Sequence, residues 1–184
     1  MTLDTAVADL FTEPEYRVEG HLKVTGRARY AGDVRQTGML HTVYVRSPFQ
    51  HALIRSVDVS QALAVPGVRA VLTGADLPEH ARFGRRLQDW PVLARDRVRF
   101  IGDRVAAIAA ETRQAAETAA ELVQVEYDEL AVVATIEDAL ADGAPVLHPD
   151  AERYTYFGKR PVVPHPNVQG QVLVLVGDDA ARAA

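Results

Sequence analysis

The stretch that most constrains the fold runs from residue 99 to residue 129, RFIGDRVAAIAAETRQAAETAAELVQVEYDE. Residues 105–110 form a continuous apolar run, which is too short to span a membrane and is typical of a buried strand. Alanines then recur at three- and four-residue spacing over 113–122, which predicts a helix with one small-residue face. Alternating apolar and polar residues over 123–128 predict a half-buried strand. This strand–helix–strand unit carries no reactive group, so it is interpreted as scaffold.

The remaining pattern predicts further short elements on both sides of this unit. Thr112 is expected to cap the central helix, because its hydroxyl can accept a hydrogen bond from an early backbone N–H. Ser60 is expected to cap a shorter helix that stops at Pro66–Gly67. A third short helix is predicted over 136–141. Strands are predicted over 38–47, 52–59 and 68–72, with alternation or β-branched residues in each.

The ends of the chain differ in character from its centre. Residues 1–15 are interpreted as a mobile leader, and 16–148 as one domain. Residues 17–33 carry glycines at six-residue spacing, which favours short extended pieces joined by turns. Residues 149–184 begin in a proline-rich stretch, so they are interpreted as a linker and the entrance to another domain. One further strand is predicted over 168–176.

Composition narrows the classes of function. The 184 residues contain no cysteine, which rules out disulfides, thiolate metal sites and cysteine nucleophiles on this chain. The net charge of −5 argues against a nucleic-acid binder. The acidic N-terminus is not a secretory signal, and no apolar run approaches the roughly 20 residues of a membrane helix. We therefore expect a cytoplasmic protein without a membrane span.

The charge is distributed unevenly along the chain. Residues 81–104 contain seven arginines and three acidic residues, so the net charge of this segment is +4 and that of the rest of the chain is −9. Most of these arginines and the only tryptophan fall in 79–96, a long irregular segment interpreted as a surface loop. Arginine is favoured where planar contacts form at interfaces. One hypothesis is therefore a protein interface at Arg82, Arg85, Arg86 and Trp90. The alternative is a solubilising loop, with Arg97 and Arg99 on the wet face of a strand.

Other candidate chemistry is weaker. The six histidines are scattered, without the spacing of metal ligands. Glu126 and Asp128 are expected on one outer face of a strand, with Glu129 beside them. Two carboxylates can share acid–base work, but solvated charge is the simpler interpretation. No GxSxG elbow and no phosphate-binding glycine motif is present.

Several short blocks of sequence follow one another in a characteristic order. They include VTGRARY at 24–30, GMLH at 38–41, VRSP at 45–48, PGVRAVLT at 66–73, VRFIGD at 98–103 and VEY at 125–127. Taken in order, these blocks resemble the N-terminal α/β-hammerhead domain of the large subunit in the aldehyde oxidase and xanthine dehydrogenase (molybdenum hydroxylase) family. The resemblance covers about residues 16–148 and departs from the family at Leu130-Ala131, where Leu-Pro is usual.

The resemblance implies an α+β hammerhead, with a mixed β-sheet, packed helices and a projecting strand pair. It also implies a non-catalytic structural domain of a molybdopterin-dependent oxidoreductase, which hydroxylates carbon with oxygen from water. In the family the molybdopterin contacts and the catalytic glutamate lie in C-terminal domains, and iron–sulfur clusters and often FAD lie on other domains or subunits. The resemblance therefore implies those domains as partners, and no catalytic, cofactor-binding or metal residue on this chain. The fragment alone is expected to be inactive.

Two other functions remain open from the residues. One is a stand-alone binding or adaptor module that uses the same fold. The other is a small enzyme that uses the acidic strand end at Glu126. The coding sequence after Ala184 would separate the first from the family interpretation, and Glu126→Gln would test the second.

Overall fold

The computed structural model describes residues 17–159 and 162–170 of the chain. The chain divides into two compact units, Met1–Met39 and Leu40–Ala184, and each is described by itself. The leader predicted at 1–15 lies outside the described residues. Of the strand predicted at 168–176, residues 168–170 are not in a strand and the rest lie outside the described residues.

The described part of the first unit contains a short helix, α2 (Gly20–Val24), and a 3-10 turn, η1 (Ala31–Asp33). The extended conformation predicted for 17–33 is therefore wrong over α2. Gly26 adopts a positive φ of 67° just after the helix, while the N–H groups of Arg27 and Ala28 donate to the carbonyl of Leu22. Glycine at this place ends a helix at no steric cost. A helix of five residues is too short to show periodicity in the sequence.

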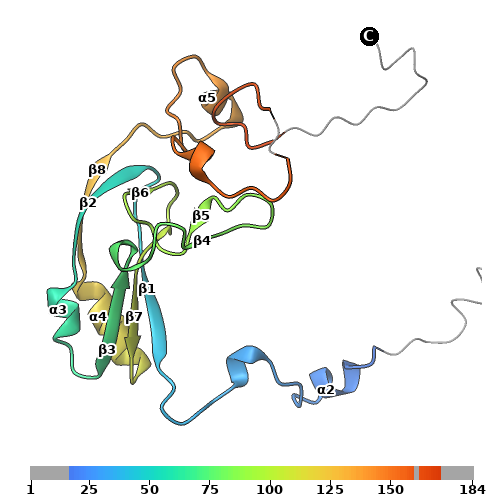
Figure 1. Ribbon diagram of the computed structural model, residues 1–184. Coiled ribbons are helices and arrows are strands. Elements are labelled where there is room, and N and C mark those ends of the chain that lie inside the picture. The colour runs from blue at the N-terminus through green and yellow to red at the C-terminus, as the bar shows by residue number, and fades with distance from the viewer. Residues whose placement is uncertain (1–16, 160–161, 171–184) are drawn as a thin grey trace, which may run out of the picture. The chain divides into compact units, whose positions relative to one another are not determined.

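The second unit contains three small sheets (Figure 1). The first has the order β1-β7-β3, the second β6-β2-β8, and the third is the β4–β5 hairpin. All described strand pairs are antiparallel, so three antiparallel sheets stand where one mixed sheet was expected. The α+β class is confirmed, and so are the strands predicted over 38–47, 52–59, 68–72, 105–110 and 123–128. The strands of the structure are β1 His41–Arg46, β2 Ala52–Asp58, β3 Val68–Thr73, β4 Arg82–Phe83, β5 Trp90–Pro91, β6 Arg97–Val98, β7 Arg104–Ala110 and β8 Gln124–Glu129.

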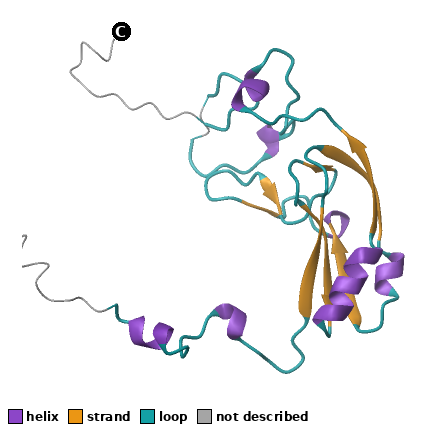
Figure 2. Ribbon diagram, turned by 180° about the vertical axis from the view of Figure 1, so that it is seen from behind, coloured by secondary structure: helices purple, strands orange, loops and turns teal. Residues whose placement is uncertain are grey.

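Strand β7 is the centre of the first sheet, as its continuous apolar run predicts. Ile108 pairs with Val43 on one side and with Val71 on the other, and it is fully buried. Helix α4 (Arg113–Leu122) covers this sheet and also packs on α3 (Ser60–Leu63), as Figure 2 shows. The small face of α4 is buried there through Ala116 and Ala119. Because alanine has no bulk beyond Cβ, the helix can lie close to the strands.

The predicted caps are half right. The Thr112 hydroxyl accepts a hydrogen bond of 3.1 Å from the N–H of Ala115, which confirms it as the cap of α4. Ser60 does not cap α3. Its own N–H donates to Asp58 Oδ1 at 2.8 Å, so the carboxylate two residues earlier satisfies that N–H, while Val59 holds the N-cap position without a side-chain hydrogen bond. A short acidic side chain satisfies an unpaired helix N–H as well as a hydroxyl does.

The strand–helix–strand unit joins two sheets rather than building one. Strand β7 contributes Ile108 to the core under α4, and its other end contributes Val105 to a second core with Ala52 and Val98. Strand β8 follows α4 but pairs with β2 in the second sheet. The exit of the unit therefore fixes the second sheet against the first. The short helix predicted over 136–141 is present as α5 (Ile136–Leu140).

The chain after α5 returns to the β4–β5 hairpin. Leu87 forms a bridge with Tyr156, the N–H of Gln88 donates to the carbonyl of Thr155, and Phe157 donates to Arg86. The side-chain amide of Asn167 donates to the carbonyls of Ala139 in α5 and Pro145 after it, so it ties residues near 167 to α5. One further helical turn, η3 (Ala151–Arg153), lies between these contacts. Within the described residues, no helix is both long and apolar enough to cross a membrane.

Candidate functional site

The β4–β5 hairpin organises the candidate site. Phe83 pairs with Trp90 across the two strands, and Arg82 pairs with Pro91. A β-carbon on Gly84 would lie 1.8 Å from the carbonyl oxygen of Leu87, so the turn at this hairpin requires glycine. Successive strand residues point to opposite faces, which separates Arg82 from Phe83.

Four aromatic rings and one arginine form a continuous surface, which we call the aromatic face: Tyr44, Phe83, Trp90, Phe100 and Arg104. The Phe83 and Trp90 rings stack with centroids 5.1 Å apart, and the edge of Trp90 meets Phe100 at 5.7 Å. The Arg104 guanidinium lies over Tyr44 at 5.3 Å, Phe83 at 5.8 Å and Trp90 at 6.0 Å. All four rings remain exposed, Trp90 to 43%. These contacts hold the rings in place without covering them.

The structure separates the four residues that the sequence proposed as an interface. Trp90 lies in the aromatic face, and Arg85 and Arg86 are exposed at the turn of the hairpin. Arg82 instead turns to the other side, where its guanidinium lies 4.6 Å from the centre of the Tyr154 ring. The sequence interpretation missed Tyr44, Phe83, Phe100 and Arg104. Tyr44 could have been predicted from its outward position on β1. Phe100 and Arg104 could have been predicted from the VRFIGDR block at 98–104.

The arginines of this region are not neutralised by ion pairs. Arg55, Arg69, Arg113 and Arg153 each lie within 4 Å of a carboxylate. None of the seven arginines between residues 81 and 104 does so within the part of the chain that the structure describes. Arg97 and Arg99 are half-buried, so the wet strand face proposed for them is wrong. Positive charge therefore accumulates around the hairpin.

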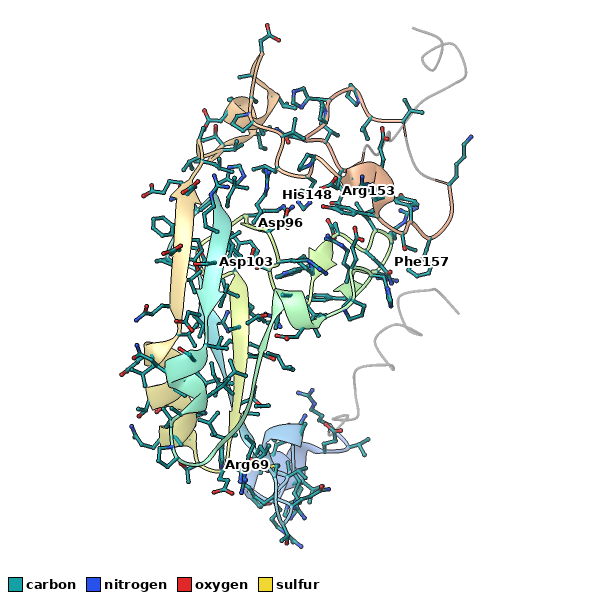
Figure 3. All side chains as sticks on the ribbon, turned by 60° about the vertical axis from the view of Figure 1, so that its left-hand side comes forward. Arg69, Asp96, Asp103, His148, Arg153 and Phe157 are labelled. Atoms are coloured by element: carbon teal, nitrogen blue, oxygen red, sulfur yellow. The ribbon has the colours of Figure 1, made fainter. Side chains whose placement is uncertain are left out.

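Asp103 fixes the turn that presents Phe100. Its buried carboxylate accepts hydrogen bonds from the N–H groups of Arg99 at 3.2 Å and Arg104 at 3.0 Å, so it closes the turn between them (Figure 3). Burial raises the pKa of this carboxyl group, although the two backbone hydrogen bonds and the charges of Arg99 and Arg104 act to lower it. Arg99 Nε donates to the carbonyl of Leu147 at 2.8 Å, and burial lowers the pKa of its guanidinium. Phe100 thus stands on a rigid turn.

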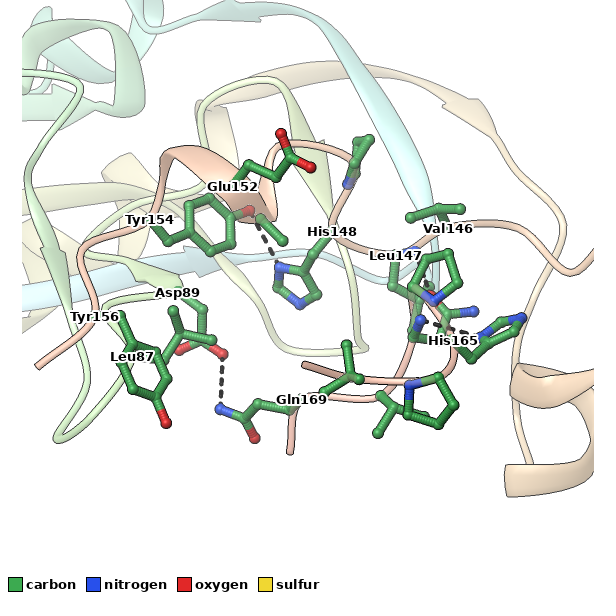
Figure 4. A pocket seen from close by; sticks show the side chains of 17 residues that line it. Leu87, Asp89, Val146, Leu147, His148, Glu152, Tyr154, Tyr156, His165 and Gln169 are labelled. Atoms are coloured by element: carbon green, nitrogen blue, oxygen red, sulfur yellow. Dashed lines mark hydrogen bonds between the residues drawn. The ribbon is translucent and has the colours of Figure 1, made fainter. Parts of the chain in front are cut away.

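A cavity of about 640 Å³ lies between the hairpin and residues 146–169 (Figure 4). His148 lies in its wall, with Nδ1 3.2 Å from the Tyr154 hydroxyl, and Gln169 Nε2 reaches Asp89 at 3.5 Å. Burial, followed by the charge of Arg99, lowers the pKa of His148 to about 4. His148 is therefore a neutral imidazole near pH 7. A second cavity of about 390 Å³ separates His148 from Trp90 and Phe100.

The acidic strand end is engaged in contacts along the sheet. Ser56 Oγ donates to Glu126 at 2.8 Å, and Arg55 forms an ion pair with Asp128. Both carboxylates are exposed, which confirms the outer face predicted for them. Within residues 17–159 and 162–170, no group of three or more histidine and carboxylate side chains is placed to hold a metal ion. The described residues therefore do not fit a metal centre, and we derive no chemistry through one on this chain.

Comparison with family models gives a match over residues 25–131, to the a/b hammerhead domain of aldehyde oxidase and xanthine dehydrogenase. A protein of Bacillus subtilis described as a probable xanthine dehydrogenase subunit is 48% identical over 134 residues, which are 73% of this chain and 18% of that protein. The nicotinate dehydrogenase large molybdopterin subunit of Eubacterium barkeri is 39% identical, over 73% of this chain and 32% of that subunit.

The solved structures agree with the sequence relatives. The CO dehydrogenase of Oligotropha carboxidovorans matches with a TM-score of 0.68 and 40% identity, over 74% of this chain and 17% of that chain. The chain thus spans from about a sixth to about a third of the length of these relatives. The matched region contains the whole aromatic face, from Tyr44 to Arg104.

Proposed function

Because the chain belongs to the aldehyde oxidase and xanthine dehydrogenase family through its a/b hammerhead domain, we propose that it is a structural domain of a molybdenum hydroxylase large subunit. The observation that carries the proposal is the family match over residues 25–131, within relatives of which the matched segment makes up about a sixth to a third. The domain's contribution is to pack against the parts of the enzyme that hold the cofactors. We place this domain at 16–148 and the entrance to the next domain at 149–184.

The proposal assigns the chemistry to other parts of the enzyme. The relatives include a large molybdopterin subunit. In the proposed enzyme, molybdopterin is held by C-terminal domains, and iron–sulfur clusters and FAD by further domains or subunits. The parent reaction would be hydroxylation of a carbon centre with oxygen from water, in the cytoplasm. An exposed aromatic surface, beside arginines that have no ion-pair partner among the described residues, supports a packing role, because aromatic residues and arginine are enriched at interfaces.

The test compares the isolated 184-residue chain with the complete enzyme. Metal analysis should find molybdenum in the complete enzyme and none on the isolated chain, and turnover in H₂¹⁸O should label the hydroxylated product. Stoichiometric molybdenum on the isolated chain would contradict the proposal. So would a complete gene product that lacks molybdopterin even after expression in a host that makes the cofactor.

A further inference from the structure

We propose that the aromatic face docks onto the molybdopterin-binding part of the parent enzyme, on a surface that presents carboxylates around an apolar centre. The inference rests on the proposed function, because it names the surface through which this domain packs. It also goes beyond the four interface residues expected from the sequence. Three features support it: the exposure of the rings, the unpaired charge and the path of the chain.

The rings supply the apolar centre of the contact. Phe83, Trp90 and Phe100 are each about two-fifths exposed. The Trp90 ring contacts Phe83 across the hairpin and Phe100 on the following turn, so the three rings form one row. Ile101, beside them in the chain, is 61% exposed. Contiguous exposed apolar surface is uncommon on monomers and marks interaction sites. Because the stacking contacts already fix the rings, little side-chain freedom would be lost on docking.

The arginines define the chemistry of the partner. Arg104 lies over three rings of the face, and Arg46 lies 5.9 Å from the Tyr44 ring. Arg46 also donates to the carbonyl of Gly102, which joins β1 to the Phe100 turn. Neither guanidinium has an ion-pair partner among the described residues. Planar guanidinium groups bind carboxylates with two parallel hydrogen bonds, so aspartate or glutamate on the partner completes the contact.

The path of the chain favours the molybdopterin-binding part as the occupant. Residues 155–157 run beside the hairpin turn, and Gln169 lies 3.5 Å from Asp89, next to Trp90 in sequence (Figure 4). In the longer relatives, the remainder of the large subunit is tethered to a domain of this kind. A tether that starts beside the face gives the attached domain a high effective concentration there. A separate subunit has no such advantage.

The direct test uses the complete enzyme, in cells that assemble it, with Trp90 replaced by p-benzoylphenylalanine. After irradiation, mass spectrometry should find cross-linked peptides from the molybdopterin-binding sequence, in the same polypeptide or a companion one, with an aspartate or glutamate beside apolar residues. Cross-links to an iron–sulfur or flavin subunit, or to a second copy of this chain, would overturn the inference. The absence of any cross-link would overturn it as well.

A second measurement keeps the test independent of the cross-linker. Hydrogen exchange of the complete enzyme should be about tenfold faster over residues 82–91 and 98–104 in the Arg104→Glu variant, because undocking exposes both segments. Arg113→Glu is the matched control, since this exposed arginine lies on α4, outside the face. Faster exchange in both variants, or in neither, would contradict the inference.

These results separate the inference from the proposed function. If the enzyme contains molybdopterin and turns over, but Trp90 forms no cross-link to the molybdopterin-binding part, then only the inference fails. If the complete gene product contains no molybdopterin, then the proposed function fails, whatever Trp90 contacts.

Discussion

The Tyr154 hydroxyl lies 3.2 Å from Nδ1 of His148, and the two rings meet edge to face with centroids 5.7 Å apart. Arg82 covers the Tyr154 ring from the hairpin. The hairpin and residues 148–154, which are distant in the sequence, therefore meet beside one half-buried imidazole. The tyrosine hydroxyl can donate to an unprotonated Nδ1 or accept from a protonated one, so the tautomer of His148 sets the direction of this hydrogen bond.

The first prediction concerns the pH dependence of stability. Burial and Arg99 lower the pKa of His148 to about 4 in the folded state, against about 6.5 when unfolded. Between these values the unfolded state binds more protons, so stability falls as the pH falls from about 6.5 towards 4. Allowing for partial solvent exposure, we expect this residue to account for about 1–2 kcal/mol between pH 7 and 4.5.

Urea denaturation at several pH values checks this expectation. His148→Gln should show a shallower loss of stability in acid than the parent chain. His80→Gln, at an exposed position, is the control and should follow the parent chain. Equal slopes for His148→Gln and the parent chain would contradict the assignment.

The second prediction concerns Gly74, which sits against the segment before β6. A β-carbon at this position would lie 2.4 Å from the carbonyl oxygen of Ala94 and 2.6 Å from Cα of Arg95. Because these are backbone atoms, they cannot move aside cheaply. We expect Gly74→Ala to cost about 3 kcal/mol of unfolding free energy, measured by urea denaturation. Gly170→Ala, where nothing lies within 4 Å, should stay within about 0.5 kcal/mol of the parent chain.

The third prediction concerns the cap of α4. Thr112→Ala removes the oxygen that accepts from the N–H of Ala115, so it should lower the unfolding free energy by about 1 kcal/mol. Thr118→Ala, in an exposed position on the same helix, removes the same hydroxyl without removing a cap. It should be neutral or slightly stabilising, because alanine has the higher helix propensity. A similar loss for both variants in thermal denaturation would rule out a capping effect.

The fourth prediction concerns assembly. The double variant Arg85→Glu/Arg86→Glu reverses two exposed charges at the hairpin turn, so it should weaken assembly of the complete enzyme without changing the unfolding of this domain. Native mass spectrometry and gel filtration measure the assembled fraction. Arg27→Glu/Arg29→Glu is the control, because it makes the same change in charge at exposed positions of the first unit. If the hairpin variant assembles as the parent does, Arg85 and Arg86 belong to a solvated loop and not to an interface.

The local sequence pattern was sufficient to predict secondary structure where the residues of an element themselves decide whether it is a helix or a strand. The apolar run of β7, the alanine face of α4 and the Thr112 cap were all predicted, because each depends on contacts within a few residues. Short elements were harder. Helix α2 was missed because five residues give no periodicity. Ser60 does not cap α3, because it is already inside the helix, and its N–H donates to Asp58 two residues earlier.

The candidate site was only partly predictable. Trp90 and the exposed arginines at 85 and 86 could be selected from composition, since tryptophan and arginine are enriched at interfaces. Arg82 was grouped with Trp90, although its guanidinium lies over the Tyr154 ring, because the sequence does not show which way a two-residue strand points its side chains. Tyr44 and Phe100 joined the face only through folding, from segments that lie 46 and 10 residues from Trp90.

The sequence by itself determined the family, the α+β class and the strand–helix–strand unit at residues 99–129, because these depend on ordered local patterns. Tertiary structure decided that this unit joins two antiparallel sheets, and that one aromatic face brings together β1, the hairpin and the turn before β7. The physical reason is that strand partners and ring contacts are chosen by packing between distant segments. Periodicity records which face of a strand is buried, but it does not record the neighbour against which that face lies.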